Sequence, residues 1–349
     1  MARRSVLTGL LAVFALTAGS VAAQDEEHLF DRNRPDGFGP PGVAGHFTLD
    51  AGELLWNFTY SREEMLGNRI GTQPISQAEL LDVFPVAPLS MLSQTLDLEL
   101  RYGLTDRLTL AASMPFIYRD DTNAVDEASF IGNFTVTSVF GSFTNDIGDV
   151  KVSTLWNVLD SGPHVLSLGI GASIPTGEID ERGRTATSER AQLPFNMQTG
   201  SGSWEVLPSL SFMTQNEFGT FGAQISSTFH VNDNDRGYKL GDRFDMTAWV
   251  SYNVMDEWIS LSARVVREEW GSVAGLDPET NTLEDPRADP FATGGTLVQL
   301  PIGFTLYVRE GALEGHRFSV EYFQPVHQDL NGPQLQVDNV VTIGWQVAF

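Results

Sequence analysis

Apolar and polar side chains alternate one by one along much of the chain. The C-terminal segment VVTIGWQVAF is a clear example. Side chains of a β-strand point alternately to its two faces. One face of this segment would therefore carry Val341, Ile343, Trp345, Val347 and Phe349. The other face would carry only small or polar side chains. The pattern predicts a strand with one apolar face that continues to the last residue.

The same alternation recurs along the chain, giving about twelve segments. Their first apolar residues are Trp56, Leu96, Leu108, Val150, Leu166, Trp204, Phe221, Phe244, Ile259, Leu300, Phe318 and Val341. Each segment is close to the ~9–11 residues that a tilted strand needs to cross a bilayer. The segments therefore predict strands that are long enough to span a membrane.

Short and long connections alternate between these segments. The short ones are residues 103–107, 160–163, 215–220, 255–257 and 309–315, and the long ones are 62–94, 119–148, 176–202, 232–242, 268–296 and 327–339. Outer-membrane barrels have short turns at one end and long loops at the other. We therefore expect an all-β fold, a transmembrane antiparallel up-and-down β-barrel of about twelve strands. A secreted β-sandwich is the alternative, but its turns would vary without this order.

The N-terminus has the features of an export signal. Arg3 and Arg4 precede the apolar run LTGLLAVFALTAG, and small residues end at Ala23. We expect a signal peptide at residues 1–23, an irregular periplasmic segment at 24–44 that could enter the barrel as a plug, and the barrel itself at 45–349. An N-terminal membrane anchor is the alternative, although the run is short for a span of ~20 apolar residues.

The chain is strongly acidic and contains no cysteine. Its formal net charge is −24; residues 1–23 contain two arginines and no acid, so without them 19 basic and 45 acidic residues leave −26. Such a surface repels phosphates, which excludes nucleic acid as a partner. The lack of cysteine excludes disulfide and thiolate chemistry. We also expect no cofactor and no bound metal.

Charged side chains recur on the strand faces opposite to the apolar ones. A charge that faces lipid at the midplane costs ~2–4 kcal/mol, so these side chains should point into the lumen. With three inward aromatic residues they form the candidate lumen lining: Asp97, Glu99, Arg101, Lys151, Glu205, Asp245, Trp249, Arg264, Tyr307, Arg317, Glu321 and Phe323. Two interpretations stay open, a selectivity lining for solutes or a network of ion pairs and packed rings that partly closes the barrel.

Two further sets of residues are candidates for metal binding or catalysis. Asp233, Asp235 and Asp242 cluster in an expected extracellular loop, but their order does not match a calcium loop. The six histidines lack zinc spacing, and no Gly-x-Ser-x-Gly elbow occurs. We therefore expect no enzyme and no catalytic residues. A hydrolase at the barrel rim, with a Ser–His pair assembled by folding, is an alternative.

Three stretches carry a family resemblance: YGLTDRLTL at 102–110, IGDVKVSTLWNVLDSGPHVLSLGIGASIPTGEID at 147–180, and TGSGSWEVLPSLSF at 199–212. Their pieces are Gly148-Asp149, Pro175-Thr176-Gly177 and the pair Gly200 and Gly202. The chain resembles the outer-membrane transporter family of the MetA pathway of phenol degradation. The resemblance implies a barrel that takes up hydrophobic or aromatic compounds, and it supplies no established catalytic residues.

Together these features predict a channel or transporter in the outer membrane of a Gram-negative bacterium, for uptake of small, hydrophobic or aromatic solutes. Its expected partners are outer-membrane lipid, the small-molecule solute and the barrel-assembly machinery, because a last strand ending in Phe349 resembles the signal that this machinery reads. The alternative function is a closed structural or surface-interaction barrel with acidic extracellular loops.

Overall fold

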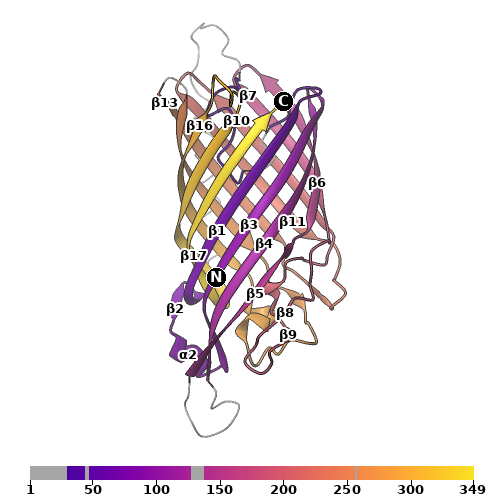
Figure 1. Ribbon diagram of the computed structural model, residues 1–349, viewed down its shortest axis with the longest axis vertical. Helices are drawn as coiled ribbons and strands as arrows, with labels where there is room; N and C mark the ends of the chain where they lie inside the picture. Colours follow the sequence, from indigo (N-terminus) through magenta and orange to yellow (C-terminus); the bar gives the residue numbers. More distant parts are fainter. Residues whose placement is uncertain (1–29, 44–46, 127–136, 256–257) are drawn as a thin grey trace, which may run out of the picture.

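The alternating segments form strands that hydrogen-bond to one another in sequence order. The computed structural model describes residues 30–43, 47–126, 137–255 and 258–349. Within these ranges eleven antiparallel strands form a closed ring, because the last strand pairs with the first (Figure 1). In order around the ring they are β1 (Leu54–Gly71), β3 (Val86–Thr105), β4 (Leu108–Asp126), β6 (Val150–Ser161), β7 (His164–Ile174), β10 (Glu205–Gln215), β11 (Gly219–His230), β13 (Arg243–Val254), β14 (Ile259–Trp270), β16 (Gly295–Tyr307) and β17 (Arg317–Ala348). The predicted antiparallel barrel is confirmed. The expected signal peptide at 1–23 and the expected boundary between residues 44 and 45 lie outside the described residues.

β17 crosses the barrel wall twice. Its residues Arg317–Leu330 pair with β16, and Leu330–Ala348 run back and pair with β1. The reversal occurs within one continuous strand, so the loop expected at 327–339 is strand instead. Counted as crossings of the wall, the ring therefore agrees with the prediction of about twelve strands.

The two ends of the barrel differ in their connections. Short turns, such as residues 106–107 and 162–163, lie at the end where the chain terminates, which we call the short-turn end (Figure 1, top). The opposite end, the loop end, carries the longer connections (Figure 1, bottom). Their short elements are β2 (Gln73–Ile75), α2 (Gln77–Leu81), β8 (Arg182–Gly183), β9 (Ala191–Gln192), η1 (Phe195–Met197), β12 (Tyr238–Lys239), β15 (Ala274–Gly275), η2 (Pro286–Ala288) and η3 (Pro290–Ala292). No helix in the described ranges is long and apolar enough to cross a bilayer.

Several strands continue into regions that were expected to be loops. β1 runs to Gly71 and β3 begins at Val86, both within the loop expected at 62–94. β4 likewise continues to Asp126 and pairs with β5 (Thr137–Ile147), within the loop expected at 119–148. In this part of β1 the exposed side chains include Arg62 and Glu64, which form an ion pair at 2.6 Å, together with Leu66 and Ile70. A regular apolar face therefore covers only part of a strand, and hydrogen-bond pairing with a neighbouring strand continues beyond that part.

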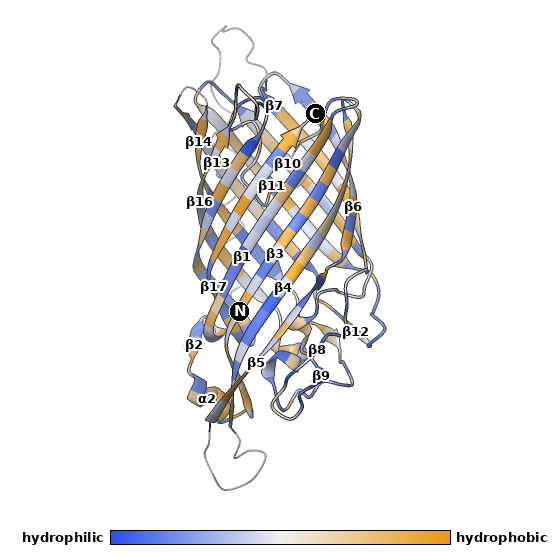
Figure 2. Ribbon diagram, in the orientation of Figure 1, coloured by the Kyte–Doolittle hydropathy of each residue, from blue (hydrophilic) through white to orange (hydrophobic). Residues whose placement is uncertain are grey.

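The apolar faces of the strands point away from the barrel axis. Figure 2 shows apolar and polar residues alternating along the strands. The outward side chains Ile170, Ile302 and Val250 are more than half exposed, at 52%, 62% and 55%. Monomeric soluble proteins rarely expose contiguous apolar patches larger than a few hundred Å², and this belt surrounds a single closed sheet. The sandwich alternative is therefore wrong, and hydrocarbon is the solvent that the belt requires.

The two faces of β11 allow a direct test of this orientation. Ile225 points outward and is 44% exposed, whereas its neighbour Ser226 points into the lumen. We expect Ile225→Arg to destabilise the barrel by ~2–4 kcal/mol, because it places a charge in hydrocarbon. Ser226→Arg should change the free energy of unfolding by less than ~1 kcal/mol, since the lumen can solvate it. Urea unfolding in lipid vesicles measures both, and equal losses would contradict the assigned faces.

Candidate functional site

The lumen is lined largely by small and polar side chains. Gly169 and Gly171 on β7, for example, face inward beside Ser209 and Ser153. Gly222 on β11 leaves room for the ring of Trp249, whose atom Cζ2 would lie 2.1 Å from a Cβ placed there. Small residues such as these let neighbouring side chains pack closely on the inner wall, and two other parts of the chain also enter the barrel.

The first is the N-terminal segment, which we define as residues 30–43 and 47–53. It hydrogen-bonds to wall and turn residues from several parts of the ring, namely Thr109, Gly162, Gln215, Asn216, Thr220, Arg264 and Arg317. Most of these partners stand at strand ends next to the short turns. Because they surround the segment, it lies inside the barrel at the short-turn end.

A buried ion pair shapes the middle of the N-terminal segment. The Arg34 guanidinium donates to both carboxylate oxygens of Asp36, at 3.0 and 3.1 Å. Thr220 Oγ1 donates to Asp36 Oδ2 at 2.7 Å, and Arg34 donates to the carbonyl oxygen of Asn216 at 2.8 Å. Both charges are almost fully buried, so they depend on these partners. The pair therefore attaches the segment to the turn between β10 and β11.

Arg317, the first residue of β17, holds the same segment from the C-terminal part of the chain. Its Nη2 donates to the carbonyl oxygens of Arg32 and Arg34, at 2.8 and 2.7 Å. Its guanidinium lies over the rings of Phe38 and Tyr307, with centroid distances of 3.8 and 4.7 Å. Cation–π contacts strengthen when desolvated. One buried arginine thus holds the segment through two backbone carbonyl groups and one aromatic ring.

Eight of the twelve candidate lining residues lie in this half of the barrel. They are Glu99, Arg101, Trp249, Arg264, Tyr307, Arg317, Glu321 and Phe323, and all are buried. They form ion pairs with one another, Arg264–Glu321 and Arg101–Glu99, both at 2.9 Å. Trp249 packs with Val43 of the segment. These side chains therefore contact the N-terminal segment or each other, which is the second of the two interpretations.

The other four candidates occupy different places. Glu205 is buried and lies 3.2 Å from Nε2 of His230. Asp97 and Asp245 are half-buried and Lys151 is exposed. Asp245 pairs with Arg243 at 2.8 Å. The use of any of the twelve as a solute lining stays a prediction.

The second insertion into the lumen comes from the loop between β7 and β10. Leu193 and Met197 are buried against inward side chains of three wall strands, Met65 on β1, Met91 on β3 and Leu335 on β17. We call these five residues the methionine cluster. Thioether side chains are flexible and polarisable, so such a surface adapts to different apolar partners. The cluster narrows the loop end of the lumen.

The residues of the family resemblance converge where this loop joins the wall. Asp149 stands between β5 and β6, and its carboxylate accepts from the backbone N–H of Gly177 at 2.8 Å. It also accepts from the N–H and hydroxyl of Ser201, at 2.8 and 2.7 Å. Gly177 and Gly200 touch so closely that a Cβ on Gly177 would lie 2.6 Å from the Cα of Gly200. These residues thus form a joint that fastens the inserted loop.

The acidic loop at 231–242 is held by ion pairs. Arg236 contacts Asp180, Asp277 and Glu279 from two other loops, at 2.6, 2.7 and 3.2 Å. Hydrogen bonding to Asp277 raises the pKa of Arg236. Burial raises the pKa of Tyr238 to about 12. Among the described residues, no group of three or more histidine and acidic side chains is arranged to hold a metal ion.

The geometry around His230 bears on the hydrolase alternative. Its Nε2 faces Glu205 at 3.2 Å and its Nδ1 faces Asp242 at 3.8 Å. A general base needs one nitrogen directed at the nucleophile. Both nitrogens of His230 instead face carboxylates, and the backbone N–H of the same residue donates to Asp242 at 2.9 Å. These contacts close the 231–242 loop.

Sequence reasoning missed several residues that organise the lumen. Arg34 and Asp36 lie in an irregular segment without periodicity, so no pattern indicated their role. Arg119, whose guanidinium donates to the carbonyl oxygen of Gln198, was expected in a loop. Asp149 had a signal, since it belongs to the stretch of the family resemblance.

The joint predicts a specific loss on substitution. Asp149→Ala removes the acceptor of a buried N–H group at Ser201 and of a half-buried one at Gly177, and an unsatisfied buried donor costs ~1–3 kcal/mol. We expect faster hydrogen exchange at the amides of Gly177 and Ser201, with the barrel still folded. Asp233→Ala, which removes an exposed acid from another loop, is the control and should leave both amides protected. Unchanged protection in Asp149→Ala would show that the joint does not depend on this carboxylate.

The loop end should also depend on pH. Burial raises the pKa of the Glu284 carboxyl above its ordinary value of 4.5. When the loop is detached, Glu284 loses its proton near pH 4.5, whereas in the docked loop it keeps the proton to a higher pH. Docking is therefore strongest below pH 4.5 and weakens as the pH rises, until the raised pKa of the docked loop is passed. The Val86 amide, which donates to the Glu284 carbonyl oxygen at 3.1 Å, reports this docking by hydrogen exchange. Glu284→Gln stays neutral and should remove this component of the pH dependence. A Gln variant that follows the wild-type pH profile would contradict the assignment.

Comparison with known proteins bears on the fold. No protein-family model matches the chain. An outer membrane channel from Pseudomonas putida F1 is similar in structure, with 15% identity, a TM-score of 0.59, and coverage of 89% of this chain and 100% of that chain. A FadL homologue from Pseudomonas aeruginosa has 10% identity, a TM-score of 0.44, and coverage of 92% and 99%. The monoaromatic hydrocarbon channel CymD has 9% identity, a TM-score of 0.37, and coverage of 94% and 99%. The likeness to the Pseudomonas putida channel shows a shared barrel fold. The resemblance to the phenol-degradation family stays a prediction.

Proposed function

We propose that the protein is an outer-membrane channel of a Gram-negative bacterium that takes up small hydrophobic or aromatic solutes. The short-turn end would face the periplasm and the loop end the exterior, as in other barrels with short turns at one end. In this arrangement the N-terminal segment is the periplasmic plug. Outer-membrane lipid covers the apolar belt, and Phe349 takes part in the assembly signal.

One observation carries the proposal: residues 30–43 of the N-terminal segment and the inserted loop are attached to the wall mainly through side-chain contacts. The N-terminal segment is held through Arg317, Arg264 and the pair Arg34–Asp36. The inserted loop is held through Asp149. Such contacts can open locally while the ring stays hydrogen-bonded, because parts of a fold open at lower free energy than the whole.

The lining at the two ends supports an apolar solute. The methionine cluster stands at the loop end, and Val43, Met213 and Trp249 pack together toward the short-turn end. The charged residues between them are partly paired, as Arg243 is with Asp245 and Glu268. An apolar solute would contact apolar side chains at both ends. Charges that are paired with each other attract ions less strongly than unpaired charges.

The proposal assigns no catalytic step to the protein. His230 lies beside two carboxylates, with Nε2 3.2 Å from Glu205, and its backbone N–H donates to Asp242, so its contacts are those of a loop anchor.

Release of the N-terminal segment should increase permeation. Arg317→Met removes two charge-assisted hydrogen bonds, each worth ~1.5–3 kcal/mol. We therefore expect the open fraction, and with it the mean conductance in planar bilayers, to rise by at least about tenfold. Arg267→Met is the matched control, since Arg267 pairs with Glu269 at the exposed loop end, at 2.9 Å, away from the N-terminal segment.

Solute transfer completes the test. Proteoliposomes with wild-type protein should take up a labelled single-ring hydrocarbon faster than protein-free vesicles, and Arg317→Met should increase the rate further. If neither protein passes ions or solute while both remain folded, the channel proposal is wrong and the closed barrel that binds partners through its loops takes its place.

A further inference from the structure

Three of the long loops at the loop end share one small apolar core. We call these loops together the cap: residues 175–204 between β7 and β10, 231–242 between β11 and β13, and 271–294 between β14 and β16. Tyr238 is 1% exposed and packs with Phe195 and Val273, which belong to the other two loops. The ring centroids of Tyr238 and Phe195 lie 4.7 Å apart. The core thus takes side chains from all three loops, so the loops depend on one another.

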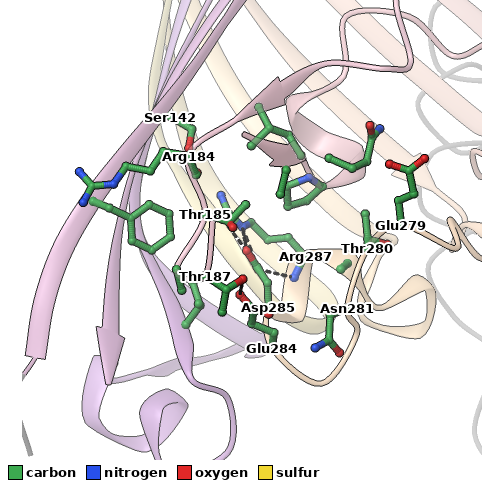
Figure 3. Close-up of a pocket in the computed structure, with 18 residues that line it drawn as sticks. Ser142, Arg184, Thr185, Thr187, Glu279, Thr280, Asn281, Glu284, Asp285 and Arg287 are labelled. Carbon is green, nitrogen blue, oxygen red and sulfur yellow. Dashed lines mark hydrogen bonds and ion pairs between the residues drawn. The ribbon is translucent and has the colours of Figure 1, made fainter. Parts of the chain in front are cut away.

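The strand pairs of the cap are separate from the barrel sheet. β12 pairs with β15, which joins the β11–β13 loop to the β14–β16 loop, and β8 pairs with β9 within the β7–β10 loop. Both pairs form two-stranded sheets of their own. A cavity of about 100 Å³ also lies between two of the loops beside β5, with Thr187 of one and Glu284 of the other among its lining residues (Figure 3). The cap can therefore come apart without breaking a strand pair of the wall, and its packing is incomplete on this side.

Arg236 joins the same three loops by ion pairs. It belongs to the β11–β13 loop, and its guanidinium contacts Asp180 of the β7–β10 loop at 2.6 Å. It also contacts Asp277 and Glu279 of the β14–β16 loop, at 2.7 and 3.2 Å. The side chains of Asp180 and Glu279 are 61% and 46% exposed, so these two pairs contribute little in water. The Asp277 side chain is only 1% exposed, and a buried charge that loses its partner is strongly destabilising. Closure of the cap therefore depends chiefly on the pair Arg236–Asp277.

One short turn of the cap also reaches the lumen. Leu193 and Met197 of the β7–β10 loop contact wall side chains in the methionine cluster. Phe195 lies between them in the chain and packs in the core of the cap. The same turn is thus supported by the wall on one side and by the cap on the other. Loss of the cap core removes one of these two supports, and with it much of what keeps Leu193 and Met197 in the lumen.

We propose that the three loops of the cap open together, that Arg236 is the latch which holds them closed, and that the cap controls access to the loop end of the lumen. When the guanidinium leaves Asp277, the shared core comes apart and the β7–β10 loop withdraws Leu193 and Met197 from the wall. The ring of strands keeps its hydrogen bonds in this step. The role of the cap in admitting solutes rests on the proposed channel function, whereas the joint opening of the loops does not.

Hydrogen exchange of the full-length protein in lipid nanodiscs tests the joint opening. The reporters are the amide of Leu193 in the β7–β10 loop and the amide of Val86, which donates to a carbonyl oxygen of the β14–β16 loop. Neither amide bonds to Arg236. We expect Arg236→Gln to accelerate exchange at both amides by at least about tenfold, because it leaves Asp277 as an uncompensated buried charge.

Two further variants separate the latch from a general loss of structure. Arg184→Gln is the matched control, because Arg184 pairs with Glu189 of the same loop, at 3.5 Å, and this ion pair joins no second loop. It should exchange like the wild type at both reporters. The double variant Arg236→Gln/Asp277→Asn removes both charges of the latch. Its exchange rates should return to within about threefold of the wild type, because replacing both partners of a buried pair can be nearly neutral.

A disulfide tests whether closing two loops also closes the third. Lys239 on β12 and Ala274 on β15 are opposite each other, and the chain contains no cysteine. Cysteines at these two positions can join the β11–β13 and β14–β16 loops covalently. In the Arg236→Gln background, oxidation should cancel the acceleration at the Leu193 amide, and reduction should restore it. An oxidised variant that still exchanges fast at Leu193 would show that the β7–β10 loop moves on its own.

Methionine oxidation by hydrogen peroxide measures access to the lumen. Met91 of the methionine cluster is 3% exposed, and Met213 toward the short-turn end is fully buried. We expect Met91 to oxidise at least about tenfold faster in Arg236→Gln than in the wild type, because the open cap lets peroxide reach its thioether. Met213 packs with Val43 and Trp249, away from the cap, and should keep its wild-type rate.

Each result decides the proposal. If Arg236→Gln accelerates exchange only within the β11–β13 loop and leaves Leu193 and Val86 unchanged, the joint opening is wrong. If Met91 stays as protected as Met213 in this variant, the cap does not control access to the lumen. Neither measurement requires conduction, so a barrel that passes no solute can still confirm the latch, and a conducting barrel can still refute it.

Discussion

The need to pair every backbone N–H and C=O group in hydrocarbon governs this structure. No water is available there to bond a free strand edge, so the sheet must close on itself. The closure is made by the two ends of the barrel chain: Leu54 and Phe349 exchange both backbone hydrogen bonds, at 2.8 and 3.1 Å. Phe349 thus pairs with the first residue of β1. Once the ring is closed, each side chain of a membrane-spanning strand must face either the lipid or the lumen.

Closure also creates an interior that the chain has to fill or leave open. The N-terminal segment and the inserted loop occupy part of this interior, and small inward residues such as Gly222, which accommodates the ring of Trp249, let side chains pack there. Both inserted parts are attached by buried charges and hydrogen bonds. Such contacts are stable only when every partner is present. The same property means that the loss of a few contacts removes much of what holds each inserted part in place.

The candidate site was only partly predictable. The alternation of side chains placed Arg264, Arg317 and Glu321 on the inward faces, since an inward register is the only inexpensive position for a charge in a membrane strand. It could not reveal what these charges contact. Arg317 binds backbone carbonyl groups that lie 283 and 285 residues away in the sequence. Contacts of this kind depend on how the irregular N-terminal segment folds inside the ring, and no periodicity encodes that path.

The loop end shows the same division. Asp149 and Gly177 belong to recognisable pieces of sequence, but only the folded loop brings the carboxylate of one to the backbone N–H of the other. Likewise, strand pairing lengthened β1 and β4 beyond their apolar parts. The sequence by itself determined the barrel, its strand faces and the alternation of its connections, because side-chain alternation and lipid exposure act locally along each strand. The tertiary structure alone decided what occupies the lumen and which loops enclose a cavity, because these depend on contacts between segments that are distant in the chain.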